Sequence, residues 1–528
     1  MPSRGYDAVV VGAGPNGLVA ANCLADKGWS VLVLEAQADV GGAVRSDTGL
    51  EAGFVHDTFS AFYPLAAASK TLRSFRLEEH GLTWRHAPAA LGHPLPDGEW
   101  AILHRDRSIT ADLIEQGHTG DGEAWLDLCG QWDRIGDQLI DGLLTPFPPV
   151  RAGLRGLARL RGVGGLEFVR TLLTPAVELG RSRFAGLRPR LLLAGNASHA
   201  DIPLEGTGSG LMAVLLTMLG QTVGFPAPEG GAGRLTHALA DRLRSLGGEI
   251  RCSTPVESIA VDGGRARAAL AADGATYAAR HAVIADVAAP HLYGRLLAPA
   301  VVPGRVRRGM RRFQLDPSTV KVDWALAGPA PWASPPPHAP GTLHIADSVE
   351  EMAEALAEVN AGTVPAHPFL LAGQMTTTDA TRSPPGTESM WAYTHVPQVT
   401  VRDAGDGGIR GQWDRDDCER FADRIQARIE RLAPGFGSRI IARRILGPRE
   451  LEERNANLIG GAINGGTAQL HQQLVFRPVP GLGRAETGIP GLYLGSASAH
   501  PGGGVHGAPG VNAARAAVFH ARLKGRRG

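Results

Sequence analysis

A glycine-rich turn near the start of the chain has the spacing that brings backbone close to a dinucleotide. After an apolar run, residues 12–17 read Gly12-Ala13-Gly14-Pro15-Asn16-Gly17. Gly12 would make a tight turn, Gly14 would let backbone approach a pyrophosphate, and Gly17 would let a helix pack closely on a strand. Pro15 and Asn16 would open that helix, whose N-terminus attracts phosphate. Such a motif is weak alone, but a strand before it and a helix after it favour a binding site over an ordinary turn.

An acidic residue stands where a dinucleotide site needs one. The apolar run at 30–35 predicts a second strand, and it ends in Glu35. A carboxylate there accepts hydrogen bonds from a ribose hydroxyl and disfavours a 2′-phosphate. Glu35 and the adjoining Ala36 are therefore candidate cofactor-binding residues.

A second glycine pair favours FAD over NAD. Residues 40–46 read Val-Gly-Gly-Ala-Val-Arg-Ser, so that Gly41 and Gly42 would approach the pyrophosphate and Arg45 would neutralise phosphate charge. An ordinary loop is the alternative interpretation. No second GxGxxG follows a strand, so we expect one dinucleotide site and no separate nicotinamide domain.

The most distinctive segment is a glycine-rich stretch at 492–510, which predicts a strand, a long turn and a helix. Backbone amides around Gly495, Gly504 and Val505 would suit the electron-rich end of a reduced flavin. The same stretch is also consistent with a long capping loop.

Three histidines are candidates for catalysis. His500 and His506 flank the predicted flavin-facing loop, and either could accept a proton while hydride leaves carbon. Alternatively, each could simply hydrogen-bond the loop backbone. His199, two residues before Asp201, could reach the site from another domain, or form a structural pair with that aspartate.

The order of predicted elements indicates how these residues are positioned. Strand and helix alternate at the start, return after residue 230, and return again near 491. We therefore predict an α/β fold: a Rossmann-type FAD-binding domain in three sequence pieces, 1–65, 222–290 and 451–528. An inserted α+β substrate-binding domain would comprise 66–221 and 291–450.

The motifs resemble those of the FAD-dependent phytoene desaturase and carotenoid isomerase family. The likeness covers 7–45, 230–285 and 457–517, and includes Asn464-Gly-Gly, Phe476-Arg-Pro-Val-Pro480 and Ala499-His-Pro-Gly-Gly-Gly504. Within the family it is closest to the branch of pyridine nucleotide-disulphide oxidoreductase domain-containing protein 2. The resemblance implies a split FAD domain in which the Val256 backbone holds the adenine edge. Desaturases usually read Gly-Gly-Arg, whereas here the arginine is displaced to Arg45.

Composition excludes several function classes. Formal charges of 53 and 52 nearly cancel, so nothing favours nucleic acid as a partner. The 4 cysteines form no C-x-x-C, which argues against disulphide chemistry, and we predict no metal site. With no signal segment at the N-terminus, and with a buried helix expected in the uncharged run at 206–228, we predict a cytoplasmic chain. Arginines at 151, 155 and 159 suggest a peripheral membrane contact, although a solvated helix face explains them as well.

Taken together, the residues predict an FAD-dependent oxidoreductase acting on carbon–carbon bonds. It would desaturate, saturate or isomerise a hydrophobic small molecule such as a polyene or lipid. Amine oxidation on the same fold is one alternative, and a non-catalytic FAD-binding scaffold is another. The sequence predicts neither the substrate nor the oligomeric state.

Overall fold

The cofactor-binding half of the molecule is built on a mainly parallel sheet. The computed structural model describes residues 5–146, 148 and 165–525. The strand order is β10-β11-β12-β1-β2-β9, and β20 also pairs with β12. The strands are β1 (Tyr6–Val11), β2 (Val31–Leu34), β9 (Glu249–Arg251), β10 (Val256–Asp262), β11 (Arg265–Ala271), β12 (Thr276–Ala285) and β20 (Leu492–Leu494). Strands far apart in sequence are thus neighbours, as three separated pieces of one Rossmann-type domain require.

Helices cover this sheet because its strands are apolar on both faces. Every residue of β2 is buried, and parallel strands of this kind need helices on their faces. Helix α1 (Pro15–Ala25) packs between α11 (Gly233–Ser245) and α18 (Ala508–Gly525). The helix thereby brings the glycine turn at its N-terminus next to the last segment of the chain.

One strand of this sheet is not evident from its sequence. A further strand, β11, lies between β10 and β12 and pairs antiparallel with both. Its sequence, Arg-Ala-Arg-Ala-Ala-Leu-Ala, has little β-branched character. Pairing on both edges, rather than intrinsic preference, makes it a strand.

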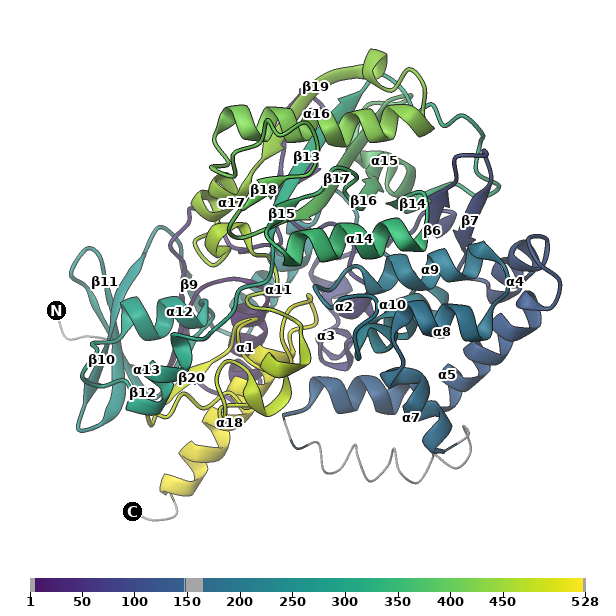
Figure 1. Cartoon of the computed structure of the whole chain (residues 1–528). Coiled ribbons are helices and arrows are strands. Elements are labelled where there is room, and N and C mark those ends of the chain that lie inside the picture. Colours follow the sequence, from purple (N-terminus) through teal and green to yellow (C-terminus); the bar gives the residue numbers. More distant parts are fainter. Residues whose placement is uncertain (1–4, 147, 149–164, 526–528) are drawn as a thin grey trace.

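The second domain is built on another seven-stranded sheet, which lies between helical layers (Figure 1). Its strand order is β19-β13-β17-β16-β14-β6-β7. The strands are β6 (Ala89–Pro94), β7 (Trp100–Leu103), β13 (Ser318–Leu326), β14 (Pro340–Ile345), β16 (Leu370–Gln374), β17 (Glu388–Val396) and β19 (Ile440–Leu446). Helix α16 (Arg415–Leu432) packs on one face through Phe421, Ile425 and Ile429.

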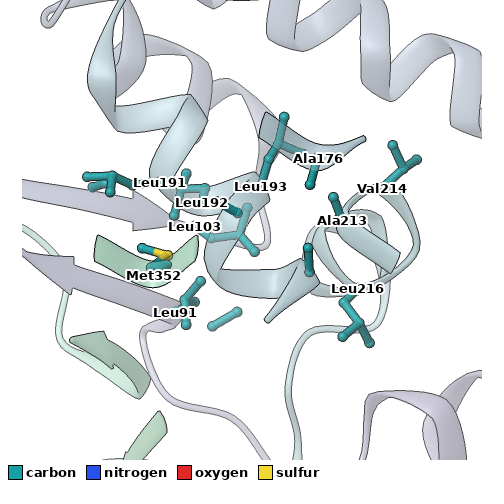
Figure 2. Close-up of a cluster of buried hydrophobic side chains, with 14 of the residues drawn as sticks. Leu91, Leu103, Ala176, Leu191, Leu192, Leu193, Ala213, Val214, Leu216 and Met352 are labelled. Atoms are coloured by element: carbon teal, nitrogen blue, oxygen red, sulfur yellow. The ribbon is translucent and has the colours of Figure 1, made fainter. Parts of the chain in front are cut away.

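The opposite face carries the largest apolar core of the molecule. Figure 2 shows leucines of β6, β7, α9 and α10 meeting Met352. The helices of this layer are α4 (Arg107–Glu115), α5 (Asp121–Leu144), α7 (Leu166–Leu173), α8 (Ala176–Arg183), α9 (Leu187–Ala197), α10 (Ser209–Thr222) and α14 (Val349–Asn360). The uncharged run at 206–228 folds into α10, a buried helix as expected. No helix among the described residues is both long and apolar enough to cross a bilayer.

Short elements complete the two domains and the connections between them. They include β3 (Ser46–Asp47), β4 (His56–Asp57), α2 (Pro64–Ala68), α3 (Lys70–Ser74), β5 (Trp84–Arg85), β8 (Ala227–Pro228), α12 (Ala289–His291), α13 (Gly304–Met310), β15 (Thr363–Val364), α15 (Met375–Thr378), β18 (Arg402–Asp403) and α17 (Pro448–Arg454). Phe75 and Leu77 pack into the core of the first domain, and so do Leu292 and Val306. The domain boundaries at 65 and 290 stay a prediction. Because these packed residues follow them in sequence, the apolar core of the first domain extends past both positions.

Candidate active site

A cleft opens where β1 and β12 end. Val11 and Ala285 are paired in register as the last residues of these parallel strands, and ligands of such sheets bind at this edge. The cleft is lined by Gly14, Pro15, Asn16, Gly42, Ala43, Val44, Asp286, Ala288, Asn455, Asn457, Leu458, Ile463, Gly465, Ser496, Ala497, Ser498, Gly503, Gly504 and Val505. The three sequence pieces of the first domain all contribute to this lining.

The glycine turn forms one wall of the cleft. Gly12 has a φ of +101°, and an added Cβ would lie 2.7 Å from the carbonyl oxygen of Asp286. At Gly14 an added Cβ would lie 2.7 Å from Oδ2 of the same aspartate and 4.0 Å from the Cα of Gly42. Side chains are therefore excluded where backbone has to approach a ligand, as the motif predicts.

Glu35 closes the turn against the second strand. Its Oε2 accepts the backbone N–H of Ala13 at 2.7 Å, and its Oε1 accepts that of Gln37 at 2.9 Å. Each carboxylate oxygen retains a second lone pair, which suits a ribose hydroxyl. The side chain is buried, so the carboxylate is fixed in place.

The second glycine pair packs directly on the first turn. Gly41 donates its N–H to the carbonyl of Ala13 at 2.9 Å, and an added Cβ on Gly42 would lie 3.0 Å from the Cα of Gly14. Arg45 follows, donating from Nη2 to the carbonyl of Arg454 at 2.7 Å. Its Nε is buried without a protein partner, and burial lowers the pKa of its guanidinium.

These features fit a flavin dinucleotide. In the cleft, Oδ1 of Asn16 is buried and has no protein partner. This oxygen needs a donor such as a hydroxyl of the cofactor's sugar or ribityl chain, whereas the Nε–H of Arg45 would suit a phosphate oxygen. Gly504 and Val505 line the opposite side, and Gly495 leads into the lining residue Ser496. Val256 starts β10 opposite Ala271 and is not among the residues that line the cleft, so its adenine contact stays a prediction.

The two C-terminal histidines differ in what they can do. In His506, Nε2 faces the carbonyl of Gly503 at 3.2 Å, and Nδ1 accepts the N–H of Ala508 at 3.1 Å. In His500, Nε2 lies 2.9 Å from the carbonyl of Thr145 and so carries the proton, because a carbonyl only accepts. Its Nδ1 is buried without a protein partner. Burial lowers the pKa of both rings, that of His506 to about 4.

His199 lies elsewhere and does not pair with Asp201. Its Nε2 meets Nε2 of His344 at 2.8 Å, and burial lowers its pKa to about 3. Asp201 instead accepts the hydroxyl of Thr467 and the N–H of Ala468. None of His199, His500 and His506 lines the cleft.

Sequence reasoning missed Asp286, the one acidic residue among the described residues that line the cleft. Its Oδ2 accepts the N–H of Gly17 at 2.8 Å across 269 positions of sequence. Burial raises its pKa to about 7, and the charge of Glu35 adds to the rise, while the Gly17 N–H opposes it. Its place directly after the apolar strand at 276–285 is a signal that could have found it, since ligands meet parallel sheets there.

A buried charge network between the two sheets was also missed. Asp57 pairs with Arg382 at 2.5 Å, and both side chains are fully buried. Lys321 of β13 donates to the carbonyl of Asp57 at 2.9 Å and pairs with Asp323. These contacts tie the first domain's β4 to the second sheet and so fix the two domains against each other.

Comparisons with known proteins agree with this architecture. A family model for an NAD(P)-binding Rossmann-like domain matches residues 10–75, and one for flavin containing amine oxidoreductase matches residues 160–349. Pyridine nucleotide-disulfide oxidoreductase domain-containing protein 2 of Mus musculus is 28% identical, over 96% of this chain and 92% of the mouse protein. Phytoene desaturase (lycopene-forming) of Pseudescherichia vulneris is 25% identical, over 94% of this chain and 96% of that protein.

These matches show an FAD-dependent oxidoreductase related to the flavin-containing amine oxidoreductases and the phytoene desaturases. They confirm the predicted resemblance and its branch, and FAD is the cofactor. The chain also shares its fold with cyclohexylamine oxidase from Brevibacterium oxydans IH-35A. That structure has a TM-score of 0.56 at 15% identity and covers 99% of this chain and 100% of its own.

Proposed function

We propose that this oxidoreductase acts on carbon–carbon bonds of an apolar polyene or lipid-like substrate. The observation that carries the proposal is the make-up of the cleft. Among the described residues that line it, the side chains are small, amide or aliphatic apart from Asp286, and none is aromatic. Ala43 and Leu458 of the lining belong to an apolar cluster with Phe59 and Leu451. FAD would occupy the part of this cleft beside Gly14 and Gly42, so the apolar cluster is the wall that a substrate would meet, and such a wall suits a hydrocarbon better than an ammonium group.

The relatives support the same substrate class. The match to the phytoene desaturase of Pseudescherichia vulneris runs nearly end to end in both chains. The match to the mouse protein is as complete, but its name states no substrate. A carotenoid-like polyene is therefore our first candidate, and other long isoprenoid or acyl chains belong to the same chemical class.

In this proposal the protein binds and orients the substrate and accepts a proton from it, and the bound flavin would accept the hydride. The apolar cluster around Leu458 would exclude water from the reacting carbon. Of the two C-terminal histidines, only His500 keeps a ring nitrogen without a partner. Because its Nε2 holds the proton, Nδ1 is the ring atom that could accept another, and His500 stays our proposed proton acceptor although it does not line the cleft.

Amine oxidation is the second candidate. It is favoured by the amine oxidoreductase family model over residues 160–349. The two reactions differ in what must be recognised, because an amine substrate brings a positive charge to the cleft. Asp286 is the acidic residue of the lining, but it accepts the Gly17 N–H and sits behind Gly14.

The deciding experiment is anaerobic reduction of the purified holoprotein. We expect the flavin band near about 450 nm to bleach with a polyene such as phytoene or a partly saturated carotenoid delivered in detergent. We expect no bleaching with cyclohexylamine or putrescine. Bleaching by an amine alone would favour amine oxidation. A flavoprotein that no substrate of either class reduces would favour a non-catalytic scaffold.

We also propose a peripheral membrane contact, through which an apolar substrate would reach the protein. The arginines at 151, 155 and 159 that first suggested one lie outside the described residues. A described surface has suitable chemistry: the end of α18, which projects from the body (Figure 1). There Phe519 and Leu523 are 60% and 41% exposed. A groove beside them is lined by Lys27, Arg515 and Arg522, and such cations favour an anionic lipid surface.

Replacing Phe519 and Arg522 together by glutamate should abolish co-sedimentation with vesicles of phosphatidylglycerol and phosphatidylcholine. The double variant would lose both the insertion of the Phe519 side chain into the bilayer and the attraction of Arg522 to lipid charge. Val399→Glu is the matched control, because Val399 is 75% exposed on another surface. Equal binding of the double variant and the unchanged protein would remove α18 as the contact.

A further inference from the structure

Two chain segments meet at the cleft and are held by one buried cation. We call residues 463–468 the strap and residues 496–504 the flavin loop; both contribute to the cleft lining. They touch directly, since an added Cβ on Gly465 would lie 3.0 Å from the Cβ of Ala497. Neither segment forms a helix or a strand. Side-chain contacts therefore have to fix the position of the strap relative to the flavin loop.

Arg477 supplies such contacts from both sides. Its Nη1 donates to the carbonyl of Thr467 at 2.9 Å, and its Nη2 donates to that of Asn464 at 3.0 Å, both in the strap. Its Nη2 and Nε also donate to the carbonyl of Ala497 in the flavin loop, at 2.8 and 3.1 Å. An added Cβ on Gly502 would lie 3.3 Å from its Cζ, so backbone of the loop also rests against the guanidinium.

Carboxylates hold the strap from its N–H side. Asp316 accepts the backbone N–H groups of Ile463, Asn464 and Gly466 at 2.8–2.9 Å. Asp201 accepts the N–H of Ala468 at 2.6 Å. The strap is therefore bonded to anions through its donors and to Arg477 through its acceptors, an arrangement that leaves its backbone little freedom.

The charge on Arg477 costs free energy to bury. Its side chain is 1% exposed, and among the described residues no carboxylate oxygen lies within 4.0 Å of it. Burial lowers its pKa to about 10, so the guanidinium remains protonated near neutral pH. Carbonyl oxygens satisfy its donors, and the charges of Asp316 and Asp201 attract it without contacting it, but burying a cation without a contacting anion still costs free energy.

We propose that Arg477 is a positioning residue for the flavin: it sets the flavin loop against the strap and keeps a positive charge close to the cofactor. An arginine fork can bond to several carbonyls in one plane, which the ammonium of lysine cannot do. A fixed positive charge stabilises a reduced flavin, which carries more negative charge than the oxidised form. This inference rests on FAD occupying the cleft and not on the identity of the substrate.

The test uses the apoprotein and holoprotein of two variants, Arg477→Gln and Arg477→Lys. The dissociation constant of FAD is measured by titrating apoprotein into fluorescent FAD, and the midpoint potential by equilibration with a redox dye. We expect Arg477→Gln to weaken FAD binding at least tenfold. We expect it also to shift the two-electron equilibrium at least tenfold towards oxidised flavin, which corresponds to about 30 mV. Arg477→Lys should weaken binding similarly but keep most of the potential, because it retains the charge.

Arg428→Gln is the matched control for the loss of a buried arginine. Arg428 of α16 is 6% exposed and pairs with Glu351 of α14, away from the cleft. The Arg428→Gln variant should have a lower Tm but unchanged FAD affinity and unchanged midpoint potential. Unchanged FAD affinity and potential in Arg477→Gln would overturn the proposal, and so would an equal potential shift in Arg428→Gln. If Arg477→Gln does not fold, unchanged FAD affinity in Arg477→Lys would overturn it. Neither readout needs a substrate, so the outcome is independent of the proposed reaction.

Discussion

Replacing Gly17 by alanine is expected to give a protein that purifies with little or no flavin. A Cβ at this position would lie 2.2 Å from the carbonyl oxygen of Gly12 and 2.9 Å from Oδ2 of Asp286. The first of these atoms belongs to the turn itself, so the turn has to move. Because the backbone of this turn has to meet the pyrophosphate, we expect FAD affinity to fall at least tenfold, about 1.4 kcal/mol.

Absorbance near about 450 nm relative to that at 280 nm reports the FAD content of the purified protein, and titration of apoprotein with FAD gives the dissociation constant. Gly130→Ala is the matched control. Gly130 lies within α5, and an added Cβ there meets no atom within 4 Å. That variant should purify yellow and at least as stable as the unchanged protein, since alanine favours helix. A Gly17→Ala protein with stoichiometric, tightly bound FAD would contradict the assignment of the turn.

The cofactor side of the site was predictable because its signals are local. Gly12, Gly14 and Gly17 lie within six positions, and the strand that ends in Glu35 follows directly. The spacing of such a motif encodes the turn, the helix N-terminus and the ribose acceptor together. The structure places Gly14 and Gly42 in contact, as their roles require.

The rest of the site depends on contacts between distant pieces, which local patterns do not encode. Asp316 and Arg477 meet the strap from elements more than a hundred positions apart. In the sequence Asp316 is an ordinary charged residue in a loop, and Arg477 stands in the 476–480 motif without any sign that it would be buried between two loops. Their importance comes from burial, and burial is decided by the packing of the two domains.

The histidines illustrate the same limit within one segment. His500 and His506 are six positions apart in the same glycine-rich loop, and the sequence gives no reason to separate them. The structure does separate them, because His506 bonds to its own loop while His500 reaches the end of α5 at Thr145. The neighbour that makes the difference is 355 positions away.

Asp286 provides the second large effect, and it is a dependence on pH. Burial raises its pKa in the folded protein to about 7, above the ordinary aspartate value of 3.8. Between these values the folded protein binds a proton that the unfolded chain has released, so stability falls as pH rises through this window. The contribution is fully present below about pH 4 and lost above about pH 7, and amounts to roughly 4 kcal/mol.

Asp286→Asn should remove this dependence while keeping the local bond, because an amide oxygen can still accept the Gly17 N–H. At pH 8 we expect the variant to be more stable than the unchanged protein, by several degrees in Tm. At pH 4 the two should be nearly equal. Thermal unfolding of both apoproteins from pH 4 to 8 measures this, and their difference cancels the titration of other buried carboxyls. If the Tm values of the two apoproteins instead change in parallel from pH 4 to 8, Asp286 is ionised over this whole range and the prediction is wrong.

The same carboxyl group should govern how FAD binding responds to pH. An ionised Asp286 behind Gly14 repels phosphate, whereas a protonated one does not. The affinity of the unchanged protein for FAD should therefore fall as pH rises past about 7, where this group loses its proton. The FAD affinity of Asp286→Asn should not change with pH. At pH 8 it should exceed the affinity of the unchanged protein about tenfold, about 1.4 kcal/mol. Because a bound phosphate raises the pKa of a neighbouring acid, binding above pH 7 should also take up a proton, which calorimetry in two buffers of different ionisation enthalpy would detect.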